Sequence, residues 1–397
     1  MRFRFICILL AALLIAACPA QAAEGHTREE VRSRFAALGQ APEGSAYEVL
    51  PSVAAPYAEG SVREEVLEDA VNYLNFLRWL ADLPPVSLDK DLTFIAQSGA
   101  TLLAANGQIS HQPEKPEDMP EDFYERASYA AASSNLASLN WMREEILRDA
   151  IEFFATDPGE NNLPVLGHRR WILNPEMGYT GLGLASSEEG ISFVAMYAHD
   201  LQGTPGEWTY VAWPAAGAFP AELMEEGMAW SIVLNPQTEI GDLRITLREL
   251  SSDRTWSFPG DGFFTVDTGA YGAGPCIIFR PEGEMEYRQN QRFLVQVEGL
   301  DIEISYAVDL ISLYPISVVS VELSQTSAEL VAGESLSLQA NVVPDWADHT
   351  DVVWNSSDPS VATVDQSGLI QALSPGSCRI SATAEGEISD SCLLTVS

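Results

Sequence analysis

The sequence predicts a multidomain protein in which an α+β domain is followed by two all-β sandwich modules. Three observations lead to this prediction. The chain has 397 residues, which is more than one ordinary hydrophobic core holds. Apolar residues recur at three- and four-residue steps up to Phe154, which is the period of amphipathic helices. Beyond Ala216 they alternate with polar residues in short runs, which is the period of β-strands.

Residues 1–23 have the pattern of a secretory signal peptide. Arg2 and Arg4 precede an apolar run that is too short to span a bilayer. Two processing routes stay open, because 20–22 form an A-x-A cleavage site while the segment ending at Cys18 looks like a bacterial lipobox, in which Cys18 would be lipidated. We therefore expect an extracellular protein, either secreted or attached to the cell surface, without a transmembrane segment in the mature chain.

The composition excludes some partners. The chain is acidic, with 57 Asp and Glu against 21 Lys and Arg and a formal net charge of −36. Such a field repels nucleic acid and anionic membrane surfaces, so we expect neither as a partner. Five cysteines less Cys7 and Cys18 leave three for the mature chain, which is too few for a disulfide scaffold.

The helical part is predicted from periodicity and capping residues. Residues 24–60 are predicted to be a spacer with one short helix, and the α+β domain is predicted over 61–215. Asp89 can cap one helix and Gly107 can close it, and Asn140 is a candidate cap for the last long helix. Helices are thus predicted over 28–38, 62–80, 89–105, 121–131 and 141–154.

Strand-like runs rich in β-branched and aromatic residues complete the prediction. Those that would form a small antiparallel sheet under the helices cover 180–185, 191–197 and 208–213. The first β-sandwich, predicted over 216–314, has runs at 230–234, 243–250, 263–266, 276–280, 293–297 and 304–310.

The last module, predicted over 315–397, is a second all-β sandwich with Trp354 as a core residue. A hairpin centred near residue 385 would place Cys378 opposite Cys392. A disulfide there would close a loop of about 15 residues and stabilise the fold by roughly 3 kcal/mol. Two free core thiols are the alternative, and both possibilities stay open.

A candidate site begins in the segment 157–175, where the acidic character of the chain reverses. His168 is followed by Arg169 and Arg170, and Asp157 and Glu160 precede them. The two arginines either border a cavity or clamp acidic loops. A second candidate, His111, lies in a proline-rich loop, where functional residues are common. Two more histidines follow His168 in the chain. They are His199 and His349, and both are expected to be surface or capping groups.

Several of these segments resemble the bacterial branch of the CAP superfamily, which is named for cysteine-rich secretory proteins, antigens and pathogenesis-related proteins. The matching motifs, in chain order, are L-N-F-L-R and L-P-P-V-S-L-D at 74–89, I-S-H at 109–111, S-S-N-L-A at 133–137 and G-H-R-R-W-I-L-N-P at 167–175. The last module resembles a bacterial immunoglobulin-like domain of the intimin and invasin type. Its main motif is V-V-W-N-S-S-D-P-S-V-A-T-V-D at 352–365.

The CAP resemblance implies an α–β–α sandwich with a cavity lined by two histidines and two carboxylates, which holds a divalent metal in some members. Position by position, the histidines fall on His111 and His168, one carboxylate on Asp157, and the other on Ser134. His111 and His168 with Asp157 as third ligand would suit zinc. Ser134 lacks the ligand or general base that the family has there, and Glu160 could replace it if its loop folds inward. The expected cavity set is His111, Ser134, Asn135, Asp157, His168 and Arg169.

Three functions follow from this reading. The favoured one is a non-catalytic module that binds a small apolar or peptide ligand, or an extracellular protein, with the β-modules as spacers and adhesion units. The second is a metal-assisted hydrolase of peptide or cell-wall substrates that uses His111, Asp157 and His168. The third is a structural stalk with a degenerate head. A Ser134–His168–Asp157 triad is disfavoured, because the glycines of a nucleophile elbow are missing around Ser134.

Overall fold

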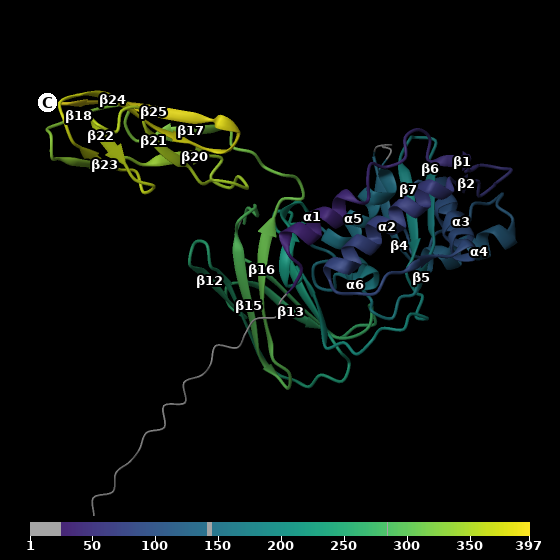
Figure 1. The fold of residues 1–397 in the computed structure, drawn as a ribbon. Coiled ribbons are helices and arrows are strands. Elements are labelled where there is room, and N and C mark those ends of the chain that lie inside the picture. Colours follow the sequence, from purple (N-terminus) through teal and green to yellow (C-terminus); the bar gives the residue numbers. More distant parts are fainter. Residues whose placement is uncertain (1–24, 141–144, 284) are drawn as a thin grey trace, which may run out of the picture.

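The structure is a computed structural model that describes residues 25–140, 145–283 and 285–397. Figure 1 shows a helical N-terminal domain, a β-sandwich that adjoins it, and a β-module that extends to the C-terminus. The predicted fold class is confirmed, with an α+β domain followed by two all-β modules. The predicted signal peptide and Cys18 lie outside the described residues. Over the part of the chain that is described, no helix has the length and apolar character needed to cross a membrane.

The N-terminal domain has a three-stranded antiparallel sheet of order β4-β7-β6 and a two-stranded parallel pair, β3-β5. Its helices are α2 (Glu64–Leu80), α3 (Lys90–Asn106), α4 (Glu121–Ala132), α5 (Ile146–Thr156) and α6 (Gly167–Ile172). Its strands are β3 (Ser87–Leu88), β4 (Ser134–Leu139), β5 (Tyr179–Thr180), β6 (Leu182–Ser186) and β7 (Ser192–Tyr197).

The sheet has a hydrophobic core on each face, so the domain is an α–β–α sandwich. Alternate residues of a strand point to opposite faces. On β4, Leu136 joins a core with Leu103 of α3, whereas Leu139 joins the core that holds α2 and α5. Strand β7 divides in the same way, with Phe193 in the first core and Met196 in the second.

The ends of the best-predicted helix are fixed by capping residues. Asp89 accepts hydrogen bonds from the backbone N–H groups of Asp91 and Leu92, and Gly107 ends α3 at a φ of 64°. The last long helix differs from the prediction. It begins at Ile146 without a side-chain cap, and part of the segment after Asn140 lies outside the described residues.

The middle module is a sandwich of two sheets, with strand orders β13-β14-β10-β8 and β12-β11-β15-β16-β9. One predicted strand belongs to a different domain than expected, since β8 pairs with β10 here and not with the sheet of the N-terminal domain. The strands are β8 (Tyr210–Trp213), β9 (Gly217–Pro220), β10 (Trp230–Leu234), β11 (Ile240–Glu249), β12 (Arg254–Phe258), β13 (Gly262–Asp267), β14 (Cys276–Pro281), β15 (Arg292–Leu300) and β16 (Ile304–Ile311).

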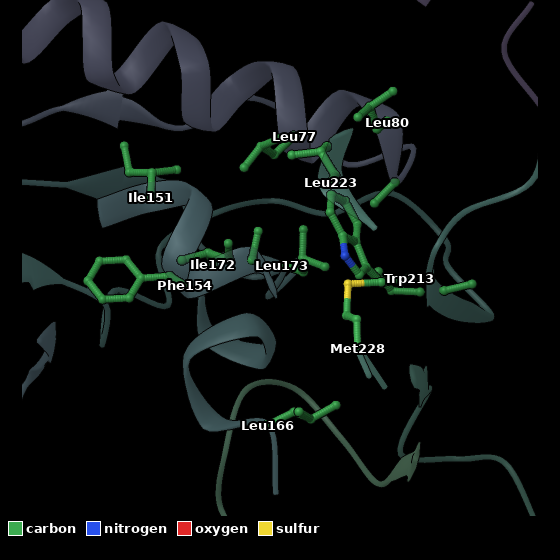
Figure 2. Close-up of a cluster of buried hydrophobic side chains, with 14 of the residues drawn as sticks. Leu77, Leu80, Ile151, Phe154, Leu166, Ile172, Leu173, Trp213, Leu223 and Met228 are labelled. Carbon is green, nitrogen blue, oxygen red and sulfur yellow. The ribbon is translucent and has the colours of Figure 1, made fainter. Parts of the chain in front are cut away.

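One hydrophobic core runs from the N-terminal domain into this sandwich. Figure 2 shows Leu77 and Leu80 of α2 and Phe154 of α5 together with Trp213 of β8 and Met228. Trp213 has no exposed surface. The two domains therefore share their interior and form one packed body.

Residues 24–60 differ from the predicted spacer because the described part of this segment is packed. Helix α1 (Arg28–Ala36) buries Val31 completely. The His26 ring stacks on Trp79 of α2 at a centroid distance of 3.7 Å. The segment continues into a hairpin of β1 (Tyr47–Val49) and β2 (Ser61–Val62).

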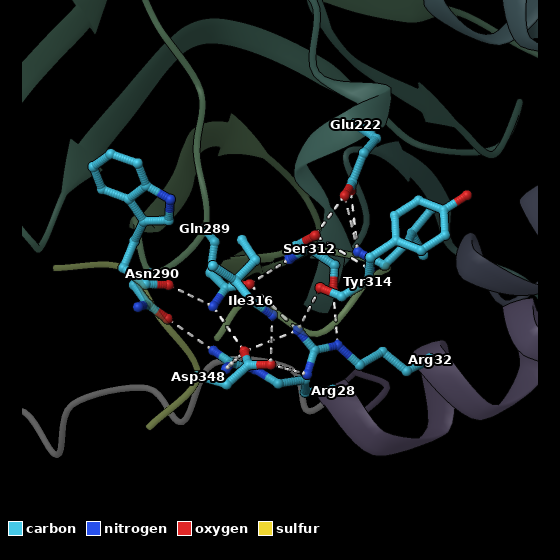
Figure 3. Close-up of polar contacts among 11 residues, drawn as sticks. Arg28, Arg32, Glu222, Gln289, Asn290, Ser312, Tyr314, Ile316 and Asp348 are labelled. Carbon is cyan, nitrogen blue, oxygen red and sulfur yellow. Dashed lines mark hydrogen bonds and ion pairs between the residues drawn. The ribbon is translucent and has the colours of Figure 1, made fainter. Parts of the chain in front are cut away.

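Helix α1 also reaches the C-terminal module, at a joint drawn in Figure 3. Asp348 accepts hydrogen bonds from Arg32 at 2.8 and 2.9 Å and from Gln289 of the middle module at 2.8 Å. Burial would raise the pKa of Asp348, but the hydrogen bonds from Arg32 and Gln289 lower it below its usual value. The C-terminal module is therefore fixed to both preceding parts.

The C-terminal module has its own core, which includes Trp354 as predicted. Of the two possibilities left open for Cys378 and Cys392, the structure has the second, because both are free thiols. The terminal hairpin pairs Cys378 with Leu394 and Cys392 with Ile380, so the two cysteines are two residues out of register. The strands are β17 (Ser320–Leu323), β18 (Ser327–Leu330), β19 (Ser335–Ser337), β20 (Ala340–Val343), β21 (Val353–Ser356), β22 (Ala362–Val364), β23 (Leu369–Ala372), β24 (Gly376–Thr383) and β25 (Ser389–Val396).

Candidate functional site

An open cavity of about 630 Å³ contains most of the predicted site residues. The predicted residues that line it are His111, Ser134, Asn135 and His168. They come from the α3–α4 loop, from the first two residues of β4 and from the start of α6. The other lining residues are Ala132, Asn162, Gly167, Trp171, His199, Ala270 and Tyr271.

His168 is oriented by Asp157, which lies behind the imidazole. Asp157 ends α5 in the left-handed conformation, with a φ of 50°. Its side chain has no exposed surface, and its Oδ1 lies 2.9 Å from His168 Nδ1. Because a carboxylate accepts, Nδ1 carries the proton and Nε2 of the neutral ring is the acceptor. Asp157 hence does not line the cavity that contains His111 and His168, which corrects the prediction, and its other oxygen accepts from the Arg169 backbone N–H.

His111 has the same tautomer for a similar reason. Its Nδ1 lies 2.8 Å from the backbone oxygen of Ala131 at the end of α4. A carbonyl oxygen can only accept, so Nδ1–H donates and Nε2 keeps its lone pair. At neutral charge, both predicted histidines therefore offer an acceptor at Nε2.

Ser134 and Asn135 lie at the start of β4, beside the histidines. Ser134 is only 4% exposed. Its Oγ has no hydrogen-bond partner among the described residues. An unpaired buried hydroxyl costs free energy, which makes it a candidate for binding a ligand. Asn135 donates through Nδ2 to the backbone oxygen of His168 at 2.9 Å, and this bond ties β4 to α6.

His199 is a cavity residue that the sequence reading missed. It is exposed, as expected, but it also lines the cavity, and its ring centroid lies 4.3 Å from that of Trp171. Desolvation and the neighbouring His111 lower the pKa of His199 below its usual value. The register explains the position: Ser134 pairs with Tyr197, so the residues that follow β7 lie beside the start of β4.

Arg169 and Glu160 lie away from the cavity, contrary to the predictions for them. The buried guanidinium of Arg169 donates to the backbone oxygens of Ala155, Thr156 and Ala229, each at 2.6 Å. Glu160 pairs instead with Arg280 of the middle module at 2.8 Å. Both residues thus connect two domains.

Comparison with known proteins identifies two domains. A model of the cysteine-rich secretory protein family matches residues 71–197. This stretch contains helices α3 to α6 and the three strands of the β4-β7-β6 sheet. Residues 71–197 form a CAP domain. A model of the bacterial Ig-like domain, group 2, matches residues 317–392, so the C-terminal module is a bacterial Ig-like domain.

Curated relatives match only parts of the chain. A 3-O-alpha-D-galactosyl-alpha-L-arabinofuranosidase of Bifidobacterium longum subsp. longum is 39% identical over 97 residues, which are 21% of this chain and 8% of that protein. An uncharacterized protein of Clostridium acetobutylicum is 33% identical over 76 residues, 19% of each chain. The chain therefore spans less than a fifth of the length of either relative.

Solved structures with similarity include two bacterial surface proteins. The N-terminal part of the S-layer protein SbsC has a TM-score of 0.18 at 11% identity, and the match covers 43% of this chain and 41% of that one. The C-terminal 282-residue fragment of intimin, bound to its receptor domain, has a TM-score of 0.16 at 12% identity, with 48% and 63% covered. Both scores are too low to indicate a shared overall fold. The CAP and Ig-like domains themselves suit a surface or binding protein.

The CAP cavity does not fit the predicted zinc site. That site needs Asp157 as the third ligand beside His111 and His168, but Asp157 is buried behind His168 and bonded to its Nδ1. Among the residues that the structure describes, no three His, Cys, Asp or Glu side chains are grouped closely enough to hold a metal ion. The disfavoured serine triad is also incomplete, because Ser134 Oγ makes no hydrogen bond to His168.

Proposed function

We propose that this protein works outside the cell and that its CAP cavity binds a small neutral saccharide without cleaving it. The middle sandwich and the Ig-like domain would hold the CAP domain at a fixed orientation. Export through the predicted signal peptide, with or without a lipid on Cys18, is part of the proposal. The one observation that carries the ligand class is the chemistry of the cavity wall.

Among the described residues, no Asp, Glu, Lys or Arg side chain lines the cavity, although the chain has 57 acidic and 21 basic residues. A site for an ionic ligand normally has a side chain of opposite charge, because burying an unpaired charge is costly. A neutral ligand meets no such cost here. The wall also differs from a wholly apolar site, since it combines imidazoles, amides and a hydroxyl with apolar and aromatic surface.

Saccharides match these groups in two ways. Their hydroxyls can donate to Nε2 of His111 and His168, and Ser134 Oγ is a buried hydroxyl without a partner in the described part of the chain. Their flat faces can lie against aromatic rings, which combine apolar area with a polar edge. Trp171 and Tyr271 provide such rings in the cavity.

Binding without cleavage follows from the missing carboxylates. Most glycoside hydrolases use a pair of Asp or Glu side chains that flank the scissile bond. In the CAP cavity the position of one carboxylate is Ser134, and Asp157 faces the back of His168. We therefore expect no glycosidase activity.

Ligand-observed NMR by saturation transfer tests the proposal. The probes are chitobiose, lactose and arabinobiose as neutral saccharides, a neutral capped dipeptide, and a fatty acid. We expect transfer to at least one saccharide, its loss in His111→Ala, and no change in His349→Ala, which removes an exposed histidine of the Ig-like domain. Transfer to the dipeptide or the fatty acid but to no saccharide would contradict the proposal.

A second candidate function is metal-independent base catalysis. The observation that favours it is the 2.9 Å contact between Asp157 and His168 Nδ1, since a carboxylate behind an imidazole makes Nε2 a better base. Ester and amide probes incubated with the protein and excess chelator would test it. Turnover that is lost in His168→Asn would favour this function, and no turnover by the folded protein would exclude it for those probes.

A further inference from the structure

The CAP cavity is completed by two residues from another domain. Ala270 and Tyr271 line it, and both lie in the loop between β13 and β14 of the middle sandwich. Tyr271 is 39% exposed. A CAP domain that ended at residue 197 would lack this wall.

Arg170 holds this loop against the CAP domain. Its guanidinium is fully buried and pairs with Asp267 at the end of β13. It also donates to the backbone oxygens of Gly269 at 3.3 Å and Gly274 at 2.9 Å. A single side chain thus binds the loop at its start, within it and near its end, so the loop is fixed by hydrogen bonds and not only by surface contact.

Two glycines allow the close approach. A Cβ on Gly167 would lie 3.1 Å from the Tyr271 ring, so the ring rests directly on the backbone beside His168. Gly272 has a φ of 61°, and a Cβ there would lie 2.6 Å from the backbone oxygen of Arg170. Since α6 carries both His168 and Arg170, one short helix positions the cavity imidazole and the loop.

We infer that Tyr271 is a ligand-contacting residue that sets the specificity of the CAP cavity, and that the middle sandwich is therefore part of the binding site. This inference rests on the proposed saccharide-binding function. The exposed part of the Tyr271 ring would cover one face of a bound sugar ring, while the histidines and Ser134 bind its hydroxyls. Its hydroxyl group is a further donor and acceptor on this residue.

The test compares Tyr271→Ala, Tyr271→Phe and the control Tyr179→Ala in the full chain, with chitobiose as the probe in titration calorimetry. Tyr179 is also an exposed tyrosine of the protein, at 43%, and does not line the cavity. A ring contact of this kind predicts a roughly three- to tenfold weaker affinity in Tyr271→Ala. Tyr271→Phe should keep most of the affinity, and Tyr179→Ala all of it.

A second readout separates failure of this inference from failure of the proposed function. Diethylpyrocarbonate modifies accessible imidazoles, and its rate at His168 is measured by peptide mass spectrometry. Because the Tyr271 ring lies against Gly167, the residue before His168, and lines the same cavity, the rate should rise in Tyr271→Ala and stay constant in Tyr179→Ala. Equal chitobiose affinity in wild type and Tyr271→Ala would overturn the inference while the function stands. If the wild type binds no chitobiose, an unchanged modification rate overturns the inference as well.

Discussion

At the scale of single residues, the site depends on which atom each hydrogen bond uses. His111 and His168 are both bonded at Nδ1, to a carbonyl and to a carboxylate, so both keep Nε2 for a ligand. The resemblance to CAP proteins predicted both histidines and also that Ser134 replaces a carboxylate. It could not predict that Asp157 lies behind the ring, because that depends on the left-handed turn at the end of α5.

Ser134→Ala should increase the free energy of unfolding by about 1 kcal/mol, because it removes a buried hydroxyl that has no partner among residues 25–140, 145–283 and 285–397. The same change should weaken saccharide binding. Urea unfolding measures the stability and titration calorimetry the affinity. Ser138→Ala, at an exposed serine of the same strand, is the control and should change neither. A loss of stability in Ser134→Ala would mean that the hydroxyl has a partner in solution.

His199 should make the protein less stable in mild acid. Its pKa in the folded state lies below the ordinary 6.5, chiefly through desolvation and then through His111. Below about pH 6.5 the unfolded chain therefore binds more protons at this site, and stability falls as the pH falls. Above that pH, His199 does not make the stability depend on pH.

Thermal unfolding between pH 5 and pH 8 checks this expectation. The fall in Tm towards pH 5 should be smaller in His199→Gln than in wild type. His349→Gln, which alters an exposed histidine in the Ig-like domain, should keep the wild-type dependence. Identical pH profiles for wild type and His199→Gln would refute the assignment.

At the scale of elements, helices were more predictable than strand partners. Asp89 and Gly107 mark the ends of α3 in the sequence and in the structure. Strand β4 was missed because five of its six residues are buried, so it shows no alternation. Without β4 its register with β7 was unknown, and His199 could not be placed. Tyr271 was missed since it comes from a loop of another domain.

Helix α6 and its neighbours depend strongly on Arg169. Burial lowers the pKa of Arg169 to about 10, yet its guanidinium serves three backbone oxygens and Ser231 Oγ. Arg169→Met would leave these buried acceptors unpaired and should cost about 3 kcal/mol or more of folding free energy. Chemical unfolding measures it. The control is Arg244→Met, at an exposed position of β11, whose folding free energy should be within about 0.5 kcal/mol of wild type. Equal stability of the two variants would contradict the role given to Arg169.

At the scale of the whole molecule, the two largest units are the CAP domain with the middle sandwich, and the Ig-like domain. One hydrophobic core runs through the first unit, whereas the second has a separate core. Scanning calorimetry should therefore show two transitions. Phe154→Ala should shift only the first and Trp354→Ala only the second, each by about 3–5 kcal/mol. A single transition that shifts equally in both variants would show that the units unfold together.

The joint at Asp348 has a consequence for how the protein is made. Arg28 and Asp348 are 320 residues apart in the chain, so the N-terminal helix is synthesised long before its last partner. At roughly 5–20 residues per second this interval is about 16–64 s. The CAP domain and the middle sandwich can be complete within that time, but helix α1 keeps part of its polar surface unpaired until the Ig-like domain arrives. The order of synthesis therefore means that this joint closes only after Asp348 has been made.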